Sequence, residues 1–342
     1  VNSAYLAEQA LWQHLPSEGW LQTADPAVWK KGASRILVWV DDFVFRGPSS
    51  EADMFYRALN ARFPGVKRSD CTFLLGHRVV RMPNGLVSIS SETYITELLQ
   101  RFEITRSKET PLPPGIQPAR MAGDPDPSIT RSFRQIVGSL IHLSNTSRPD
   151  VAFAGSALGH VASKPNKRQL EAARHTLKYL HGSPGRAIEF VAQSEDQRNR
   201  LTTYVDASYA DAPGFRSQTG YIIMMNGAPI AWASRTQKFV TTSSQEAEIV
   251  AAADMVKELV FLRELLNSWH CEAWPCKYSD KDPLVCHEDN MGAISWFENG
   301  LMAERTKHYG VRLAYIREQM RRINLVWRYI PTGEQLADMR SE

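Results

Sequence analysis

The sequence predicts a mixed α/β (α+β) fold with two parts of different character. In the first part, apolar runs of strand length alternate with amphipathic helical segments, and two such runs flank the Asp-Asp pair of RILVWVDDFVFR, residues 35–46. A proline-rich segment and a mainly helical stretch follow. From about Leu201 the order becomes three strands, a helix, a strand, helices, a strand and a helix. This order favours a mixed sheet that begins as an antiparallel meander and continues through crossovers.

The first 110 residues mix helices and strands. Residues 49–64 predict a capped helix that ends at Pro64, and residues 71–90 predict two strands joined by a turn at Pro83-Asn84-Gly85. Residues 90–102 predict a further amphipathic helix with Ser90 or Ser91 as its N-cap.

The middle of the chain is a linker followed by helices. Residues 110–128 contain six prolines, which is typical of a linker. Residues 129–182 predict helices with a break at Arg148-Pro149.

The last part of the chain alternates strands and helices. Asn226-Gly227 joins two of its first three strands and is a strong hairpin signal. The predicted elements are strands over 201–210 and, on either side of that turn, 219–234; a helix over 244–268; a strand over 283–289; helices over 290–299 and 307–323; a strand over 324–332; and a terminal helix from Glu334.

Length and composition indicate a folded soluble protein of two or three domains. The chain has 342 residues, of which 43% are hydrophobic and 23% are charged. Its net charge of +3 argues neither for nor against a nucleic-acid partner. No apolar run approaches the roughly 18 residues of a membrane span, and the first residues do not resemble a signal peptide. We therefore expect no membrane partner and an intracellular location, cytoplasmic or nuclear. The missing initial Met suggests a piece of a longer protein.

The four cysteines contain no CxxC pair, which fits a reducing compartment. Three of them lie near two histidines in one region, but their spacing matches no zinc pattern, so buried or loop thiols are favoured. These residues are His270, Cys271, Cys276, Cys286 and His287.

Asp41 and Asp42 are predicted at the tip of a hairpin between two core strands. A turn is the simpler interpretation and is favoured on these residues alone, because Asp tolerates turn geometry. The alternative is a metal site, since hard cations such as Mg²⁺ take carboxylate oxygens.

Carboxylates recur in the last part of the chain at positions that could converge. Asp206 falls on the first strand and shares a face with Thr202 and Tyr204. Asp289 immediately follows the strand segment LVCHE, residues 284–288, at its carboxyl end, where ligands collect in α/β sheets. Asp338 is expected in the terminal helix.

The long helix offers two further acids at the borders of its apolar face, Glu246 and Glu248. Glu246 comes three residues after Ser243 and is assigned to a capping box, so Glu248 is assigned to the site. An oxygen cage of Asp206, Glu248, Asp289 and Asp338 would suit two Mg²⁺ (or Mn²⁺) ions that support phosphodiester cleavage.

A basic segment lies between Lys164 and Arg186 and carries a local excess of five positive charges. A solvated helix face is one interpretation, and contact with phosphate is the other. The residues assigned to nucleic-acid binding are Lys164, Lys167, Arg168, Arg174 and Lys178.

Taken in order, these motifs resemble the carboxy-terminal part of a copia-type retrotransposon polyprotein, in which reverse transcriptase precedes RNase H. The resemblance rests on LVWVDDFVF, FLLGHRV, YITELLQRF, FRQIVGSLIHLSNTSRPDVAF, RSQTGYIIMMNGAPIAWASRTQKFVTTSSQEAEIVAAA, EDNMGAI, RTKHYGVRLAYIRE and TGEQLADM. It implies a reverse-transcriptase palm remnant at 1–110, linker and thumb or connection helices at 111–192, and an RNase H-like domain at 193–342. It also implies that Asp41 and Asp42 descend from the polymerase metal site, with Asp41 the direct ligand.

The departures from the family decide which activity is expected. The family's first polymerase Asp would fall just before Val1, and residues of the nucleotide pocket and the fingers are missing, so we expect no polymerase activity in this chain. The resemblance therefore implies Mg²⁺-dependent RNase H cleavage of the RNA strand in RNA–DNA hybrids. The alternative is a degenerate or repurposed copy that binds nucleic acid or a protein without chemistry. The oligomeric state is left open.

Overall fold

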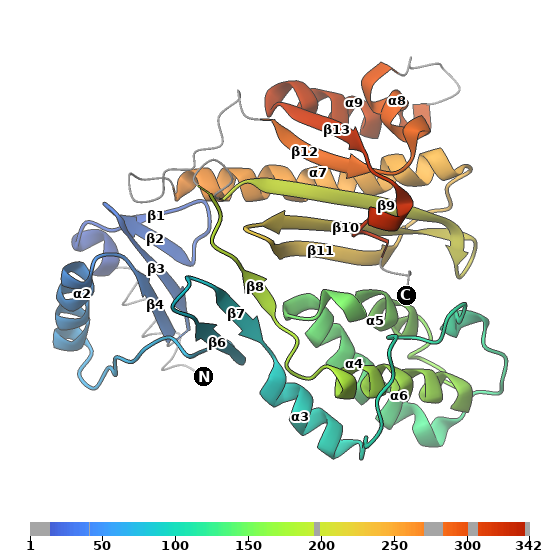
Figure 1. Cartoon of the computed structure of the whole chain (residues 1–342), viewed down its shortest axis with the longest axis horizontal. Helices are drawn as coiled ribbons and strands as arrows, with labels where there is room; N and C mark the ends of the chain where they lie inside the picture. The colour runs from blue at the N-terminus through green and yellow to red at the C-terminus, as the bar shows by residue number, and fades with distance from the viewer. Residues whose placement is uncertain (1–13, 41, 195–198, 270–282, 300–306, 339–342) are drawn as a thin grey trace. The chain divides into compact units, whose positions relative to one another are not determined.

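The structure, a computed structural model, describes residues 14–40, 42–194, 199–269, 283–299 and 307–338 (Figure 1). The chain divides into two compact units, residues 1–71 with 259–279 and residues 72–258 with 280–342. The division into three domains at residues 110 and 192 stays a prediction. None of the described helices is both long and apolar enough to cross a membrane.

The first unit contains an antiparallel sheet of order β1-β2-β3-β4 and the helix α2. Its elements are β1 (Leu21–Gln22), β2 (Val28–Lys31), β3 (Ser34–Trp39), β4 (Asp42–Arg46) and α2 (Ser49–Arg62). The predicted hairpin is confirmed, since Trp39 pairs with Asp42. The expectation of two core strands is half wrong: β3 is buried, whereas β4 is the sheet's edge and is at most half-buried.

Helix α2 ends before Pro64 as predicted, but its predicted side-chain cap is absent. Pro48 occupies the N-cap position and makes no side-chain hydrogen bond. The amides of Glu51 and Ala52 instead donate to the carbonyl oxygen of Pro48.

The second unit begins with a sheet of order β5-β6-β7-β8. Its strands are β5 (Phe73–Leu74), β6 (His77–Arg81), β7 (Val87–Ser90) and β8 (Ile188–Phe190). The turn between β6 and β7 needs the left-handed backbone of Gly85, whose φ is +84°. Strand β8 was not predicted: it is short, and it pairs with β7 across about 100 residues of sequence, a contact that local patterns do not encode.

Helices fill the middle of this unit and share one apolar core. They are α3 (Glu92–Arg101), α4 (Thr130–Thr146), α5 (Ala152–Gly159) and α6 (Lys167–Gly182), with 3₁₀ turns at Pro118–Arg120, Pro127–Ile129 and Pro149–Val151. The predicted break at Arg148-Pro149 is confirmed, and Arg148 is fully buried there. Ser91 stands at the N-cap of α3, but its hydroxyl bonds Ser147 and His77 and does not cap the helix.

The last sheet has the order β11-β10-β9-β12-β13 and confirms the predicted mixed sheet. Strands β9 (Leu201–Ala212), β10 (Arg216–Met225) and β11 (Ala228–Thr236) form the antiparallel meander, with the hairpin at Asn226-Gly227. Strands β12 (Leu284–Glu288) and β13 (Leu325–Tyr329) are parallel to β9. Strands β12 and β13 end together, level with the middle of β9, and ligand sites collect at such strand ends in α/β sheets.

Helices α7 (Ser244–Ser268), α8 (Met291–Asn299) and α9 (Lys307–Arg322) complete the fold (Figure 1). The predicted terminal helix is wrong for the described residues. After a 3₁₀ turn at Thr332–Glu334 the chain is irregular to Asp338. The side chain of Gln335 accepts from Ala337 N–H and donates to Val205 O, and these bonds hold the segment on the sheet in place of helical ones.

Candidate active site

Asp206 lies midway along β9, and Asp289 directly follows the carboxyl end of the adjacent parallel strand β12. On β9, Thr203 and Val205 are buried and Asp206 is half-buried, as the predicted alternation requires. Tyr204 pairs with His287 in the register of β9 and β12. Two residues beyond this pair come Asp206 on β9 and Asp289 directly after β12.

The rings of Tyr204 and His287 mark the face of the sheet on which these two aspartates lie. Their centroids are 4.7 Å apart and their planes differ by 17°. His287 Nδ1 also lies 3.1 Å from Thr203 O, which fixes the imidazole ring. The middle of β9 and the end of β12 are thus held in a defined register just before the two acids.

The first turn of α7 separates the roles of its two glutamates. Ser243 Oγ accepts a 3.1 Å bond from Glu246 N–H, and Glu246 Oε2 accepts from the amide and the hydroxyl of Thr242 at 2.6 and 2.9 Å. The cap assigned to Glu246 is therefore confirmed, although its carboxylate bonds Thr242 where a standard capping box would use Ser243 N–H. Both glutamates were predicted at the borders of the apolar face, but they are more buried than that. The exposed fraction is 3% for Glu246 and 4% for Glu248.

Glu248 has an environment typical of an active-site acid. Burial and then repulsion from Glu288 raise its pKa well above the ordinary value, with Asp206 and Asp289 adding to the repulsion. The backbone N–H of Ala207 opposes this shift by bonding the carboxylate. Glu248 Oε2 is buried and has no hydrogen-bond partner among the described residues.

Glu288 is a carboxylate that the sequence analysis missed. It is fully buried, and burial together with repulsion from Asp289 and Asp206 raises its pKa well above the ordinary value. A signal for it exists: it occupies the same face of β12 as buried Leu284 and Cys286. Cys286 beside it is inert, because burial raises the pKa of its thiol to about 12.

Asp338 is brought towards Asp206 by the irregular segment that precedes it. Gln335 Nε2 donates a 2.9 Å bond to Val205 O, the carbonyl next to Asp206. Gly220, which pairs with Asp206 across β9 and β10, leaves room for this segment, since a Cβ there would lie 2.5 Å from Ala337 O. The absent side chain at Gly220 thus lets the residues before Asp338 lie directly on the sheet.

The chemistry of this donor set suits a hard divalent cation. The acids offer only oxygen, and Glu248 and Glu288 each leave a buried oxygen without a hydrogen-bond partner in the described part of the chain. In the present arrangement no three acidic, His or Cys side chains of the described residues are close enough to hold one ion. The carboxylates would have to move together to bind a cation, as mutually repelling groups do when a counter-charge arrives.

The basic segment is divided between exposed and structural positions. Lys164, Lys167 and Arg168 are exposed. Arg174 is half-buried and donates a 3.1 Å bond to Phe102 O at the end of α3, and Lys178 is half-buried as well. Of the five residues assigned to nucleic-acid binding, only Lys164, Lys167 and Arg168 are therefore exposed to solvent.

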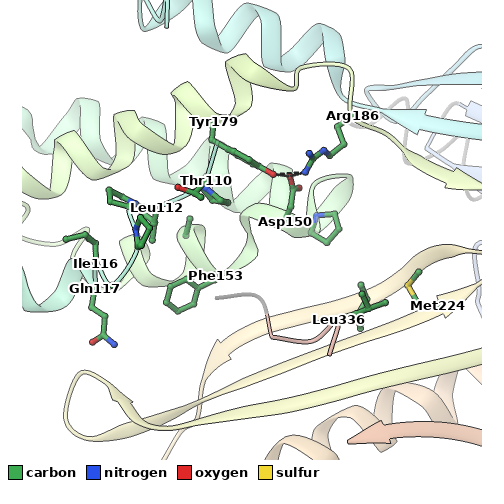
Figure 2. A pocket seen from close by; sticks show the side chains of 17 residues that line it. Thr110, Leu112, Ile116, Gln117, Asp150, Phe153, Tyr179, Arg186, Met224 and Leu336 are labelled. Carbon is green, nitrogen blue, oxygen red and sulfur yellow. Dashed lines mark hydrogen bonds and ion pairs between the residues drawn. The ribbon is translucent and has the colours of Figure 1, made fainter. Parts of the chain in front are cut away.

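Arg186, at the end of this segment, is held by Asp150 and Tyr179. Its Nη1 donates to Asp150 Oδ2 at 3.2 Å and to Tyr179 Oη at 2.6 Å, and Tyr179 donates to the same Asp150 oxygen at 2.7 Å. Figure 2 shows this group at one end of a cavity of about 710 Å³ whose other walls are mainly apolar. Buried Arg148 also binds Asp150, donating from Nε to Oδ1 and from Nη2 to Oδ2.

Comparison with known proteins identifies the sequence relatives of this chain. No protein-family model matches the chain. The Pol polyprotein of transposon RE1 from Arabidopsis thaliana is 31% identical over 311 residues, which are 89% of this chain and 20% of that polyprotein. The homologues of this chain are Pol polyproteins of copia-type retrotransposons. The family predicted from the ordered motifs is thereby confirmed.

Two further matches describe the extent of the similarity. The Pol polyprotein of transposon TNT 1-94 from Nicotiana tabacum is 28% identical and covers 95% of this chain. LC11-RNase H1, isolated from compost by a metagenomic approach, covers 42% of this chain and 92% of its own, with 18% identity and a TM-score of 0.32. This Pol chain spans about a fifth to a quarter of the length of the polyproteins it matches.

Of the two polymerase-type aspartates, the structure describes only Asp42. Asp41 lies outside the described residues, as do Cys271 and Cys276. Asp42 opens β4, is exposed and pairs with Trp39 in the hairpin. A polymerase-type role for the two aspartates stays a prediction.

Proposed function

We propose that this Pol chain carries an RNase H-type nuclease that cleaves the RNA strand of an RNA–DNA hybrid with the help of two divalent cations. The observation that supports the proposal most is the environment of buried Glu248, whose pKa is raised by burial and by Glu288, Asp206 and Asp289, beside a register that places Asp206 level with the end of β12. Membership of a Pol family supports the hybrid as substrate, because such polyproteins copy RNA into DNA.

The proposed catalytic set is Asp206, Glu248, Asp289 and Asp338. Two Mg²⁺ or Mn²⁺ ions, when bound, would activate a water molecule and stabilise the leaving oxygen. Asp206 and Asp289 would supply ligands from the open face of the sheet, and Glu248 from α7. The bond from Gln335 to Val205 would hold Asp338 within reach of the same cations.

The test is cleavage of a hybrid whose RNA and DNA strands carry different labels, with and without Mg²⁺. We expect the RNA strand alone to be cut, only with the cation, and not by Asp206→Asn or Asp289→Asn. Each variant should keep the fold and raise the metal-free melting temperature, because it removes one of several mutually repelling charges. A wild-type chain that binds the hybrid without cutting it would support the non-catalytic alternative.

A metal effect on stability is a second readout. Mg²⁺ should raise the melting temperature of the wild-type chain, since a ligand that binds only the folded state stabilises it. The rise should be smaller for Asp206→Asn. An equal rise in both proteins would place the bound metal elsewhere.

A further inference from the structure

Glu288 is a buried acid whose hydrogen bonds do not account for its position. The residue is fully buried at the end of β12. One carboxylate oxygen, Oε1, accepts a 3.1 Å bond from Asn290 N–H, while Oε2 has no hydrogen-bond partner among the described residues. A buried carboxylate without compensation is costly, so its retention needs a neighbouring group or ion.

The charged groups that act on both Glu248 and Glu288 are acids, Asp206 and Asp289. Glu248 on α7 also leaves a buried Oε2 without a hydrogen-bond partner among the described residues, and Glu288 is the charge that acts on it most strongly. No ion pair between described residues joins either acid to a Lys, Arg or His side chain. Two buried glutamates thus face the same region, each with one unused oxygen.

We propose that Glu288 is a further ligand of the divalent-cation centre, and that it acts with Glu248 from the buried face of the sheet. Asp206 and Asp289 would reach the same centre from the open face. The ligand class is a hard divalent cation, because every available donor is a carboxylate oxygen. This inference rests on the proposed function only for the existence of the metal centre and not for the reaction.

The competing explanation is a neutral carboxylic acid that fills space and binds no metal. Gln copies the shape and the hydrogen-bonding capacity of that neutral acid but is a poor ligand for Mg²⁺. Glu288→Gln therefore separates the two explanations. Glu246→Gln is the matched control, since Glu246 is equally buried but has its partners in the helix cap.

The experiment is Mg²⁺ titration of the full 342-residue chain by calorimetry, without nucleic acid. We expect Glu288→Gln to weaken Mg²⁺ binding at least tenfold and Glu246→Gln to leave the affinity within about twofold. Wild-type affinity in a folded Glu288→Gln protein would overturn the inference. If wild type binds Mg²⁺ through Glu288 but cuts no hybrid, the proposed function fails and this inference stands.

A second variant covers the case in which Glu288→Gln does not fold. Glu288→Cys places a soft thiolate at the same position, and thiolates select soft cations such as Cd²⁺ over Mg²⁺. We expect the ratio of Cd²⁺ to Mg²⁺ affinity to rise at least tenfold relative to wild type. The protonated thiol of Cys286 is present in both proteins and sets the baseline. An unchanged ratio would also overturn the inference.

Discussion

The hydroxyl group of Thr332 donates a 2.7 Å hydrogen bond to Oδ2 of Asp289. The bond joins the turn after β13 to the end of β12, so it restricts how the Asp289 carboxylate can rotate. A group that orients a metal-ligating carboxylate typically contributes 10- to 100-fold to metal affinity or activity. Thr332 is therefore a positioning residue of the proposed site.

Replacing Thr332 with Val should slow hybrid cleavage about tenfold, because Val keeps the shape and removes the donor. Thr332→Ser keeps the hydroxyl and should restore most of the rate. The measurement is the cleavage rate at saturating and at limiting Mg²⁺. Equal rates for the Val and Ser variants would remove Thr332 from the site.

Gly220→Ala should damage the site through the segment that carries Asp338. The added Cβ would meet Ala337 O at 2.5 Å, so the segment must shift away from Asp206. We expect a loss of stability of about 1–3 kcal/mol and a clear loss of cleavage. The control is Gly333→Ala, which adds a Cβ into open space in the same segment and should cleave normally.

The two glutamates of α7 should respond in opposite ways to loss of charge. Glu246→Gln should cost about 1 kcal/mol of stability or less and spare cleavage, since it weakens a helix cap. Glu248→Gln should abolish cleavage and stabilise the metal-free protein at neutral pH, because it removes the cost of burying a carboxyl group whose pKa is raised on folding. Thermal melts and cleavage assays on both variants decide the matter, and the reversed pattern would show that the acids are wrongly assigned.

Asp150 should make the stability of the chain depend on acid pH. Burial alone would raise the pKa of this carboxyl, but the hydrogen bonds and charge of Arg148, with Tyr179 and Arg186, lower it below its ordinary value of 3.8. A depressed folded-state pKa contributes stability that is present above the unfolded pKa and is lost as the pH falls through the folded one. We expect the melting temperature to fall below about pH 4 for this reason.

Asp150→Asn should lack that part of the acid dependence. It should also lower the melting temperature at neutral pH, because breaking a buried pair typically costs about 3–5 kcal/mol. Melting curves from pH 3 to pH 7 measure both effects. Parallel curves for wild type and variant would show that another group controls the acid transition.

The exposed and half-buried basic residues should separate in a salt titration. Replacing Lys167 and Arg168 with Gln should weaken hybrid binding and reduce the log–log salt slope by roughly one unit per lost phosphate contact. Arg174→Gln should instead lower stability with little change of slope, because Arg174 bonds Phe102 O. An unchanged slope in the double variant would show that Lys167 and Arg168 face solvent and do not contact phosphate.

Local sequence patterns predicted much of the fold. The predicted helix over residues 244–268 matches α7 at both ends, and the Asn226-Gly227 turn lies between β10 and β11 as predicted. These features depend on periodicity, capping and turn chemistry, which neighbouring residues determine. The convergence of Asp206 with Asp289 stays a prediction; the structure shows that β12 runs parallel to β9 and ends beside the middle of that strand.

The sequence by itself determined most of the element types, the mixed sheet, the family and the capping role of Glu246. The tertiary structure alone decided three further matters: the pairing of β8 with β7, the irregular segment before Asp338, and the burial of Glu288 beside Glu248. The physical reason is the distance along the chain over which these contacts act. Gln335 bonds a carbonyl 130 residues away, and that bond outweighs the local preference for a helix.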